Sequence, residues 1–381
     1  MASPLRWRRL LTGPALALAA ALAAAGCASA TPGTSDTSAN TPARAAAAIT
    51  TAQAEQAFNT YVAATAQAIS TDDGTLALSV VTGAQQAVVS AELAMDGAHP
   101  ASGDSAAYSG VLTLESAAYT YGTPAFYLPE PAGYPRFFVA DVTRAVNGIN
   151  PAKGATASIG GAEVPIDGRV LMLFEQSTAA GPWRLASTSQ LPAGMRLPPL
   201  ATDKNGYVPQ VPLTATDLLA QPYATGPLQA AVVDDGPASA AVKAVDEGPL
   251  TTALYQAARD RSGTGLQVPR GDIYQWEMEG TAYPAFALQT ANGGALVLYT
   301  MYLNRTVAVP SYINKGDPIE SGPPIAVPLD LSLLLPANRP TPRVELEGQD
   351  LLSFAAVDPP AGAAKIQVIA IGGGLDYAVA A

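Results

Sequence analysis

The sequence predicts an α+β fold made of two similar modules, each with helices packed on a curved antiparallel sheet. Three observations predict this: helix-like patterns precede strand-like patterns, the order occurs twice, and short sequence matches connect the two occurrences. A chain of 381 residues is long enough to bury two domain-sized cores. Hydrophobic residues make up 49% of the chain and charged residues 13%, which is typical of a packed globular protein.

The first module is expected at residues 49–191 and begins with helices. Thr50 and Gln53 have the spacing of a capping box, and apolar side chains then recur at helical intervals. Asp72-Asp73-Gly74 is expected to end this helix and to cap a second one over residues 76–95. Alternating apolar and polar residues, separated by turn signals, then predict strands at residues 111–114, 119–128, 136–146, 169–176 and 183–190.

A Pro/Gly-rich stretch at residues 192–236 is predicted to link the modules. The second module, residues 237–381, repeats the order of the first. Helical segments are expected at 237–245 and 249–261, and a proline-rich insertion at 306–342 is expected to form a long surface loop. The strands of this module are predicted at residues 272–279, 282–290, 295–304, 325–335, 343–348, 350–357 and 365–371.

Sequence matches in the same order relate the two modules. The matching pairs are VVTGAQQAVVSAEL (80–93) with AVDEGPLTTALYQA (244–257), TPAFYL (123–128) with YPAFAL (283–288), and RFFVADVTR (136–144) with LVLYTMYLNR (296–305). Because all three occur at similar spacing, they predict an internal duplication of one α+β module.

The amino-terminal 26 residues have the pattern of a lipoprotein signal peptide. A segment with three arginines precedes an apolar run of 16 residues, which is too short for a comfortable transmembrane helix and typical of a secretory signal. The run ends at AAGC, residues 24–27, which resembles the lipobox in which a cysteine is acylated before cleavage. Ala28-Ser29-Ala30 fits ordinary signal peptidase instead, so cleavage before Cys27 and cleavage after Ala30 both stay open.

Acylation of Cys27 is the expected outcome, because this only cysteine of the chain directly follows the apolar run. The lipid, palmitate or a similar acyl chain, would hold the protein on the extracytoplasmic face of the cell membrane. Residues 27–48 are rich in Ala, Ser, Thr and Pro and are expected to form a disordered tether. A single cysteine also excludes an intramolecular disulfide.

The segment GPWRLA, residues 181–186, follows a hairpin turn and looks like the closing strand of nuclear transport factor 2-like domains. Together with the lipobox, the Ala/Thr-rich tether, the helices around T-G and E-G-P-L-T-T, and PPLATDKNGYV at 198–208, it resembles a family of uncharacterised actinobacterial membrane lipoproteins. The resemblance covers most of residues 40–381. It implies a location and two cone-shaped α+β modules, and it brings no catalytic residues.

Charge and scarce residue types exclude several function classes. The formal net charge is -11; without the three arginines of the signal peptide, 20 basic residues become 17 against 31 acidic ones. Nucleic-acid binding is therefore not expected. His99, the only histidine, is expected in a solvated turn, with a general base as the alternative, and neither G-x-S-x-G nor S-x-x-K occurs. One histidine and one acylated cysteine cannot build a zinc site, so we expect no metal and no cofactor.

Carboxylate pairs and a glycine run are the next candidates. Asp72-Asp73, Asp234-Asp235 and Asp246-Glu247 are expected to precede and cap helices, with Ca²⁺ ligation or a glycosidase-like acid pair as the alternatives. Gly372-Gly373-Gly374 follows an apolar strand, but no helix pattern comes after it. A phosphate-binding loop is therefore only weakly indicated there.

Aromatic side chains supply the remaining candidate site. They are expected either to fill the sheet cores or to line an apolar pocket in each module, where tyrosine hydroxyls would orient a ligand. The expected pocket walls are Tyr61, Tyr119, Tyr121, Phe126, Phe137, Trp183, Tyr255, Trp276, Tyr283, Phe286 and Tyr299.

These observations favour a non-enzymatic cell-envelope lipoprotein that binds a small apolar ligand, a cell-wall component or another envelope protein. A carboxylate-dependent hydrolase of envelope polymers and a purely structural scaffold are the alternatives. The sequence predicts no oligomeric state.

Overall fold

A computed structural model of the chain describes residues 49–98, 119–130, 133–146, 156–260, 273–308, 325, 331, 334–335 and 342–380. All of these belong to one compact unit, Arg44–Ala381. The signal peptide, Cys27, the tether, His99 and the strand predicted at 111–114 lie outside the described residues. Within the described part, no helix is long and apolar enough to cross a membrane.

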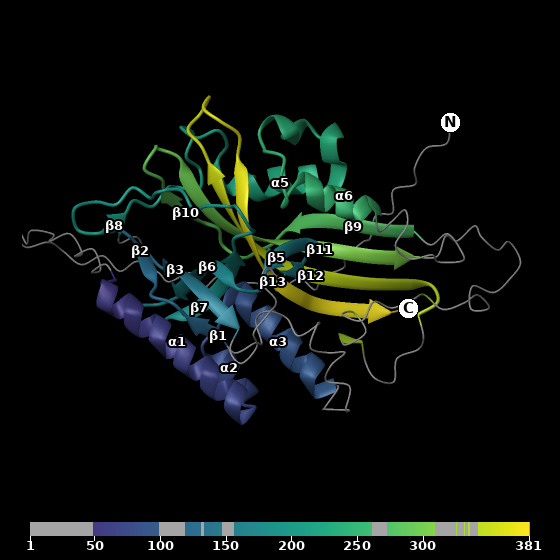
Figure 1. Cartoon of the computed structure of the whole chain (residues 1–381), viewed down its shortest axis with the longest axis horizontal. Helices are drawn as coiled ribbons and strands as arrows, with labels where there is room; N and C mark the ends of the chain where they lie inside the picture. The colour runs from purple at the N-terminus through teal and green to yellow at the C-terminus, as the bar shows by residue number, and fades with distance from the viewer. Residues whose placement is uncertain are drawn as a thin grey trace, which may run out of the picture. The chain divides into compact units, whose positions relative to one another are not determined.

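Eleven strands form one curved, unclosed sheet in the order β10-β11-β12-β13-β7-β6-β3-β2-β8 (Figure 1). Beyond this path, β1 pairs with β3 and β9 pairs with β11. From the first half of the chain come β1 Tyr119–Tyr121, β2 Ala125–Pro129, β3 Arg136–Val146, β6 Gly168–Gln176 and β7 Arg184–Gln190. From the second half come β9 Ile273–Gly280, β10 Phe286–Gln289, β11 Ala295–Ala308, β12 Glu345–Asp358 and β13 Gln367–Ala380, while β8 Tyr207–Val208 lies between the two sets.

Helices precede the strands in both halves. The first half has α1 Thr51–Thr71, α2 Gly74–Ser79 and α3 Gly83–Ala98, and the second has α5 Thr225–Asp235 and α6 Thr252–Asp260. Short 3₁₀ helices, η1 Pro222–Ala224, η2 Gly236–Ala238 and η3 Ala240–Lys243, surround α5, and a separate hairpin consists of β4 Thr156–Ile159 and β5 Ala162–Pro165.

The predicted start of the first helix is confirmed. The Thr50 side chain accepts a hydrogen bond from the Gln53 N–H, and the Gln53 side chain accepts one from the Thr50 N–H, which is a capping box. Asp72 ends α1 in the left-handed region at φ 53°, and the Asp73 carboxylate caps α2 by accepting from the Leu76 N–H at 3.0 Å.

The continuous helix predicted over residues 76–95 is wrong. Its chain breaks between α2 and α3 because Val81 pairs with Leu185 of β7 instead of continuing the helix. The Thr82 N–H donates to the Leu185 carbonyl at 2.8 Å, and the Leu185 N–H donates to the Val80 carbonyl at 3.0 Å. This pairing with a distant strand outweighs local helix propensity.

Other differences also concern local patterns. The linker predicted at 192–236 contains β8, η1 and α5. Asp234-Asp235 end α5, and Asp235 precedes η2 without forming a side-chain cap to it. Residues 237–245 form 3₁₀ turns. The two strands predicted between 343 and 357 are the single strand β12, and the strand predicted at 119–128 is divided into β1 and β2.

The β4–β5 hairpin was not predicted, although its Gly160-Gly161 turn, with both φ angles positive, is a typical hairpin signal. In the segment 325–335, the described residues Leu331 and Leu334 are helical rather than extended.

The two halves of the sheet have the same pairing order. In the first half, β1 and β2 both pair with β3, which continues to β6 and β7; in the second, β9 and β10 both pair with β11, which continues to β12 and β13. The sheet is continuous because β13 meets β7 at Ile371 and Gln190.

The register of the central strands also recurs. Phe138 lies opposite Phe174 with the ring centroids 4.8 Å apart, and Tyr299 lies opposite Phe354 with the centroids 5.7 Å apart. At the same spacing along these strands, arginine lies opposite glycine in both halves: Arg144 opposite Gly168, and Arg305 opposite Gly348.

Strand alternation divides the apolar side chains among several cores. The central core joins one face of each half, with Phe137 and Leu171 from the first and Phe286 and Leu298 from the second. The other face of the first half packs on α1, and the other face of the second half packs on α5 and α6, on different sides of the sheet in Figure 1. The phenylalanines of the matched P-A-F-x-L motifs therefore differ, because Phe126 faces the helices and Phe286 faces the central core.

Candidate functional site

Several predicted pocket walls of the first half pack edge-to-face in one aromatic cluster. Phe58 of α1 contacts Tyr121 and Phe126, with ring centroids 5.5 and 6.2 Å apart. Tyr61 contacts Phe174 at 5.8 Å, and Trp183 contacts Phe138 at 5.1 Å. Such distances are typical of aromatic pairs in cores, so the contacts favour packing, and ligand binding by these rings stays a prediction.

The other predicted wall residues lie in different surroundings. Phe137 and Phe286 contact each other at 4.4 Å in the central core, and the Arg144 guanidinium lies 4.3 Å above the Tyr119 ring. Tyr255 accepts a hydrogen bond from Arg259 at 2.8 Å. Trp276 has its ring 6.3 Å from that of Tyr274. The structure therefore does not bring these side chains together in one place.

Tyr299 is buried in the second half, where its hydroxyl donates to Gln229 Oε1 at 2.7 Å. Gln229 in turn donates from Nε2 to the Leu250 carbonyl at 2.8 Å. Burial raises the pKa of Tyr299 far above its usual range. This buried and satisfied network stabilises the core beneath α5 and α6 and is not accessible to a ligand.

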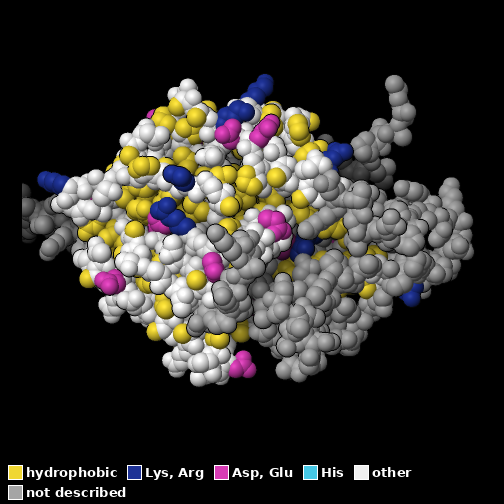
Figure 2. All heavy atoms as spheres, viewed as in Figure 1, with side chains coloured by type: hydrophobic (Ala, Val, Ile, Leu, Met, Phe, Trp, Pro, Cys, Tyr) yellow, Lys and Arg dark blue, Asp and Glu magenta, His cyan; other side chains and the backbone are white. Residues whose placement is uncertain are grey.

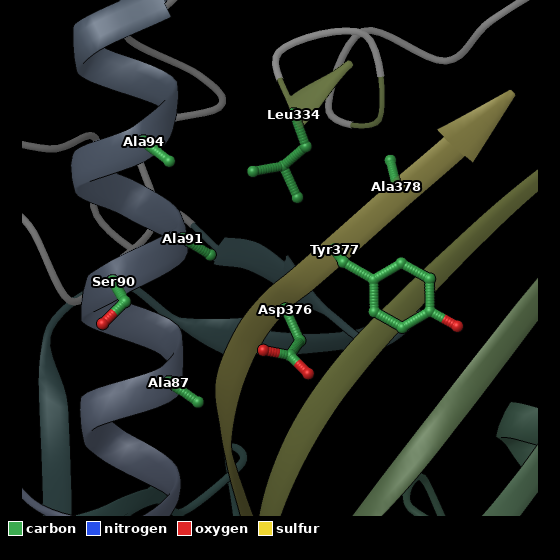
Figure 3. A pocket seen from close by; sticks show the side chains of 8 residues that line it. All are labelled: Ala87, Ser90, Ala91, Ala94, Leu334, Asp376, Tyr377 and Ala378. Carbon is green, nitrogen blue, oxygen red and sulfur yellow. The ribbon is translucent and has the colours of Figure 1, made fainter. Parts of the chain in front are cut away.

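An open groove of about 350 Å³ lies between α3 and the end of β13 (Figure 3). It combines elements of both halves of the chain, since α3 packs on β12 and β13 as well as on β7. Small side chains that share one face of α3 form one wall, and β13 and a leucine form the other. The lining residues are Ala87, Ser90, Ala91, Ala94, Leu334, Asp376, Tyr377 and Ala378.

Asp376 is the carboxylate of this groove, and a β-bulge positions it. Tyr377 lies opposite Gln349 and Leu375 lies opposite Asp350, so Asp376 is the extra residue of β13. Its side chain lies on the side of α3, whereas the Tyr377 ring extends away from that helix (Figure 3). Within the described residues the carboxylate has no hydrogen-bond or ion-pair partner, and its partial burial raises its pKa.

Two further tyrosines lie beside the groove. Tyr283 and Tyr302 pack against a small cluster of Ala84 and Val88 of α3 and Leu351 of β12, and Ala87 packs against the same cluster. Burial is the first cause that raises the pKa of each phenol, and the negative charge of Asp376 raises it further. The pKa of Tyr377 is also raised, first by burial and then by nearby carboxylates that include Asp376.

The site therefore combines three phenol rings with one carboxylate. Of these four residues, Tyr283 alone is among the pocket walls that the sequence predicts. The alternation of β11 could have placed Tyr302 on the same face as the groove, but no local signal marks the bulge at Asp376.

The groove has few groups that could perform chemistry. Ser90 donates its hydroxyl hydrogen bond to the Gln86 carbonyl at 2.7 Å, as serine often does within a helix. Asp376 is the single carboxylate of the described lining, whereas glycoside hydrolysis uses two. In the described part of the chain, no group of three or more His, Cys, Asp or Glu side chains is placed to hold a metal ion.

Positive charge does not gather on the face of the molecule that Figure 2 displays. Lysine and arginine side chains of the described residues lie scattered over this face between apolar and acidic ones. Electrostatic attraction of a polyanion needs clustered cations, so this face offers no basis for it.

Asp358 is a second carboxylate with an unusual environment, far along β12 from the groove. It is fully buried, and its Oδ1 accepts a hydrogen bond from the Ala220 N–H at 3.4 Å. Burial raises its pKa to about 6. Asp358 thus fixes the segment before α5 against the end of β12, but the folded protein holds its charged form at a free-energy cost.

We expect the Asp358→Asn variant to be more stable than the wild type at pH 7.5, by up to about 3 kcal/mol, and to lose this advantage towards pH 4. The folded pKa lies above the unfolded value of 3.8, so the wild type loses stability as the pH rises through about 6. Asparagine keeps the acceptor for Ala220 and removes the charge. Urea unfolding at pH 4.5 and pH 7.5 measures the difference.

Asp217→Asn is the matched control, because Asp217 is exposed and lies only three residues before Ala220. We expect its stability to follow the pH dependence of the wild type. An Asp358→Asn variant that is less stable than the wild type at pH 7.5 would contradict the prediction.

The described sequence matches a known family and a lipoprotein. The model of a family described as Domain of unknown function (DUF8094) matches residues 45–374. The chain is 29% identical over 251 residues to the "Uncharacterized lipoprotein SCO2278" of Streptomyces coelicolor, and the alignment covers 66% of each protein. The chain thus spans just under two thirds of the length of that relative. No solved structure matches the chain.

Proposed function

The chain belongs to the family described as Domain of unknown function (DUF8094), and we propose that it is a lipid-anchored protein of the cell envelope that binds a ligand without catalysing a reaction. The proposal has an anchoring part, a structural part and a binding part, and each is supported by different residues.

The anchor is Cys27 on the extracytoplasmic face of the cell membrane. An apolar run of signal-peptide length leads to AAGC, and residues 27–48 then supply a tether before the folded unit. The similarity to a protein named as a lipoprotein supports this role.

The folded unit consists of two copies of one module of the nuclear transport factor 2-like kind, packed through one face of each half-sheet. The repeated pairing order and register support this proposal. Phe138 opposite Phe174 corresponds to Tyr299 opposite Phe354, and Arg144 opposite Gly168 corresponds to Arg305 opposite Gly348. Independent folds would have no reason to share these registers.

The groove between α3 and β13 carries the binding part of the proposal. Its volume of about 350 Å³ is sufficient for a small ligand or for one group of a larger one. Asp376 could orient such a ligand, and it is the single carboxylate of the described lining, whereas a glycosidase-type hydrolase site needs two. A structural scaffold is the second candidate, which the filled aromatic cluster around Phe58 favours.

We expect the mature protein, purified from its own membrane, to begin at Cys27 and to carry the mass of a diacylglyceryl group. Mass spectrometry of the amino-terminal peptide measures this, and native mass spectrometry of the same sample detects any co-purifying ligand. The Cys27→Ala variant should partition into the aqueous phase in a detergent phase separation, while the wild type partitions into the detergent.

Protease treatment of intact spheroplasts tests the face of the membrane, since an extracytoplasmic protein is digested without lysis. A mature chain that begins at Thr31 without an acyl group would contradict the anchor. A ligand-free protein with an acylated Cys27 would instead support the scaffold.

A further inference from the structure

The lining of the groove is chemically simple. Ala87, Ala91 and Ala94 of α3 and Leu334 give it apolar walls, and Asp376 supplies the negative charge. The described lining contains no lysine or arginine that could neutralise this carboxylate. An apolar groove with one unpaired anion is complementary to a molecule that joins an apolar body to a positive charge.

Aromatic rings add to this complementarity. Tyr377 lines the groove, and Tyr283 and Tyr302 pack against the cluster of Ala84, Val88 and Leu351, against which Ala87 of the groove also packs. All three phenols interact electrostatically with Asp376, which places their rings in the field of its charge. The faces of aromatic rings attract cations, most strongly where water is partly excluded.

Carboxylates outside the groove also attract a positively charged ligand. Glu279 of β9 lies opposite Tyr302, and Glu347 of β12 lies near Tyr377, whose phenol both carboxylates influence. A cation that approaches this end of the sheet is therefore attracted before it reaches Asp376.

Two other ligand classes fit less well. A bare metal ion would need several oxygen ligands, and the described lining offers the carboxylate of one residue. A sugar would need several free donors and acceptors, but the Ser90 hydroxyl already donates to the Gln86 carbonyl, and alanines form most of one wall.

We propose that the groove between α3 and β13 binds an organic ammonium group, with the Asp376 carboxylate as counter-ion, the rings of Tyr283 and Tyr302 beside the positive charge, and the alanine wall against the apolar part of the ligand. This inference rests on the binding part of the proposed function and is independent of the anchor at Cys27.

The test compares choline with 3,3-dimethyl-1-butanol, which has the same shape but carries carbon in place of the charged nitrogen. Full-length protein in an uncharged detergent is titrated with each compound, and saturation-transfer NMR of the ligand measures binding. We expect choline to bind at least about tenfold more tightly than the neutral compound. The Asp376 carboxylate and the tyrosine rings attract the positive charge of choline, which the neutral compound lacks.

Variants assign the binding to the groove. Asp376→Asn should weaken choline binding about tenfold or more without a change in the thermal unfolding temperature, since no residue that the structure describes forms a hydrogen bond or ion pair with this carboxylate. Ala94→Leu, on the exposed part of α3, should fill the groove and weaken both compounds. Asp235→Asn removes an exposed carboxylate on α5 and should bind choline as the wild type does.

Phosphocholine distinguishes two sources of the ammonium group. If phosphocholine binds as tightly as choline, the natural ligand is an ammonium group linked to a phosphate, as in a headgroup. If phosphocholine binds much more weakly, the ligand is an ammonium compound without phosphate, because Glu279 and Glu347 would repel the phosphate.

Equal affinity for choline and its neutral analogue would overturn the inference, as would full binding by Asp376→Asn. Binding of a lysine-rich peptide without binding of choline would assign the ammonium group to a lysine of a protein partner and would overturn a small-molecule ligand. A co-purifying ligand that contains no positively charged nitrogen would overturn the ammonium assignment and leave the binding role standing.

Discussion

Replacing Gly372 by alanine is expected to lower the free energy of unfolding by about 3 kcal/mol or more. An added Cβ would lie 2.0 Å from the Thr188 carbonyl oxygen and 2.7 Å from its carbonyl carbon. Both are backbone atoms of β7 and cannot rotate away, so β13 and β7 would have to separate where the two halves of the sheet join. Urea unfolding of the wild type and the variant measures the loss.

Gly280→Ala is the matched control. Gly280 also lies in a strand, at the end of β9, but an added Cβ would meet no heavy atom within 4 Å. We expect its stability to differ from that of the wild type by less than about 0.5 kcal/mol. Similar effects of the two substitutions would show that the close approach to Thr188 is not what requires glycine.

This close approach explains a motif that the sequence could not interpret. Gly372-Gly373-Gly374 offered a weak case for phosphate binding, whereas the structure places all three glycines inside β13. Gly373 has φ +96°, and an added Cβ would lie 2.0 Å from the Leu351 carbonyl oxygen. The glycines allow β13 to pass β7 and β12 at short range, a role that depends on chain segments far away in sequence.

Local patterns predicted the elements whose causes are local. The capping box at Thr50 and the strand 136–146 are found as predicted, because a side chain three residues away or a simple alternation determines each. The match of RFFVADVTR with LVLYTMYLNR also holds in three dimensions, since Arg144 and Arg305 occupy corresponding registers. Hydrophobic periodicity and internal sequence repetition were therefore sufficient to predict these elements and the correspondence of the two strands.

Long-range pairings account for what the sequence missed. The helix 76–95 is interrupted by a bridge to β7, and the two halves of the sheet join where β13 pairs with β7, with Ile371 opposite Gln190. The groove likewise combines α3 with β13, from opposite ends of the folded unit. The aromatic pattern of the sequence predicted Tyr283. Asp376 could not be predicted, because a bulge in β13 turns its side chain towards α3, and no local signal places α3 beside β13.

The second large effect is expected at the buried ion pair of the second half. Arg305 Nε lies 2.9 Å from Asp350 Oδ2, and Arg305 Nη2 donates to Oδ1 at 3.1 Å. Both residues are buried, with exposed fractions of 7% and 6%. Asp350→Asn should lower the free energy of unfolding by about 3–5 kcal/mol at pH 7, because it leaves the guanidinium charge buried without its counter-ion.

The matching position in the first half of the sheet shows which variant separates the effect of charge from the effect of packing. There, Val170 occupies the position of Asp350, two residues after the glycine that faces the arginine, and Arg144 donates instead to Gln190 Oε1 at 2.9 Å. At this position the module thus accommodates an apolar side chain as well as a carboxylate. The double variant Arg305→Met, Asp350→Leu, which removes both charges, should recover most of the stability that Asp350→Asn loses, as apolar replacements of buried ion pairs do. A double variant as unstable as Asp350→Asn in urea would instead assign the loss to packing and not to an uncompensated charge.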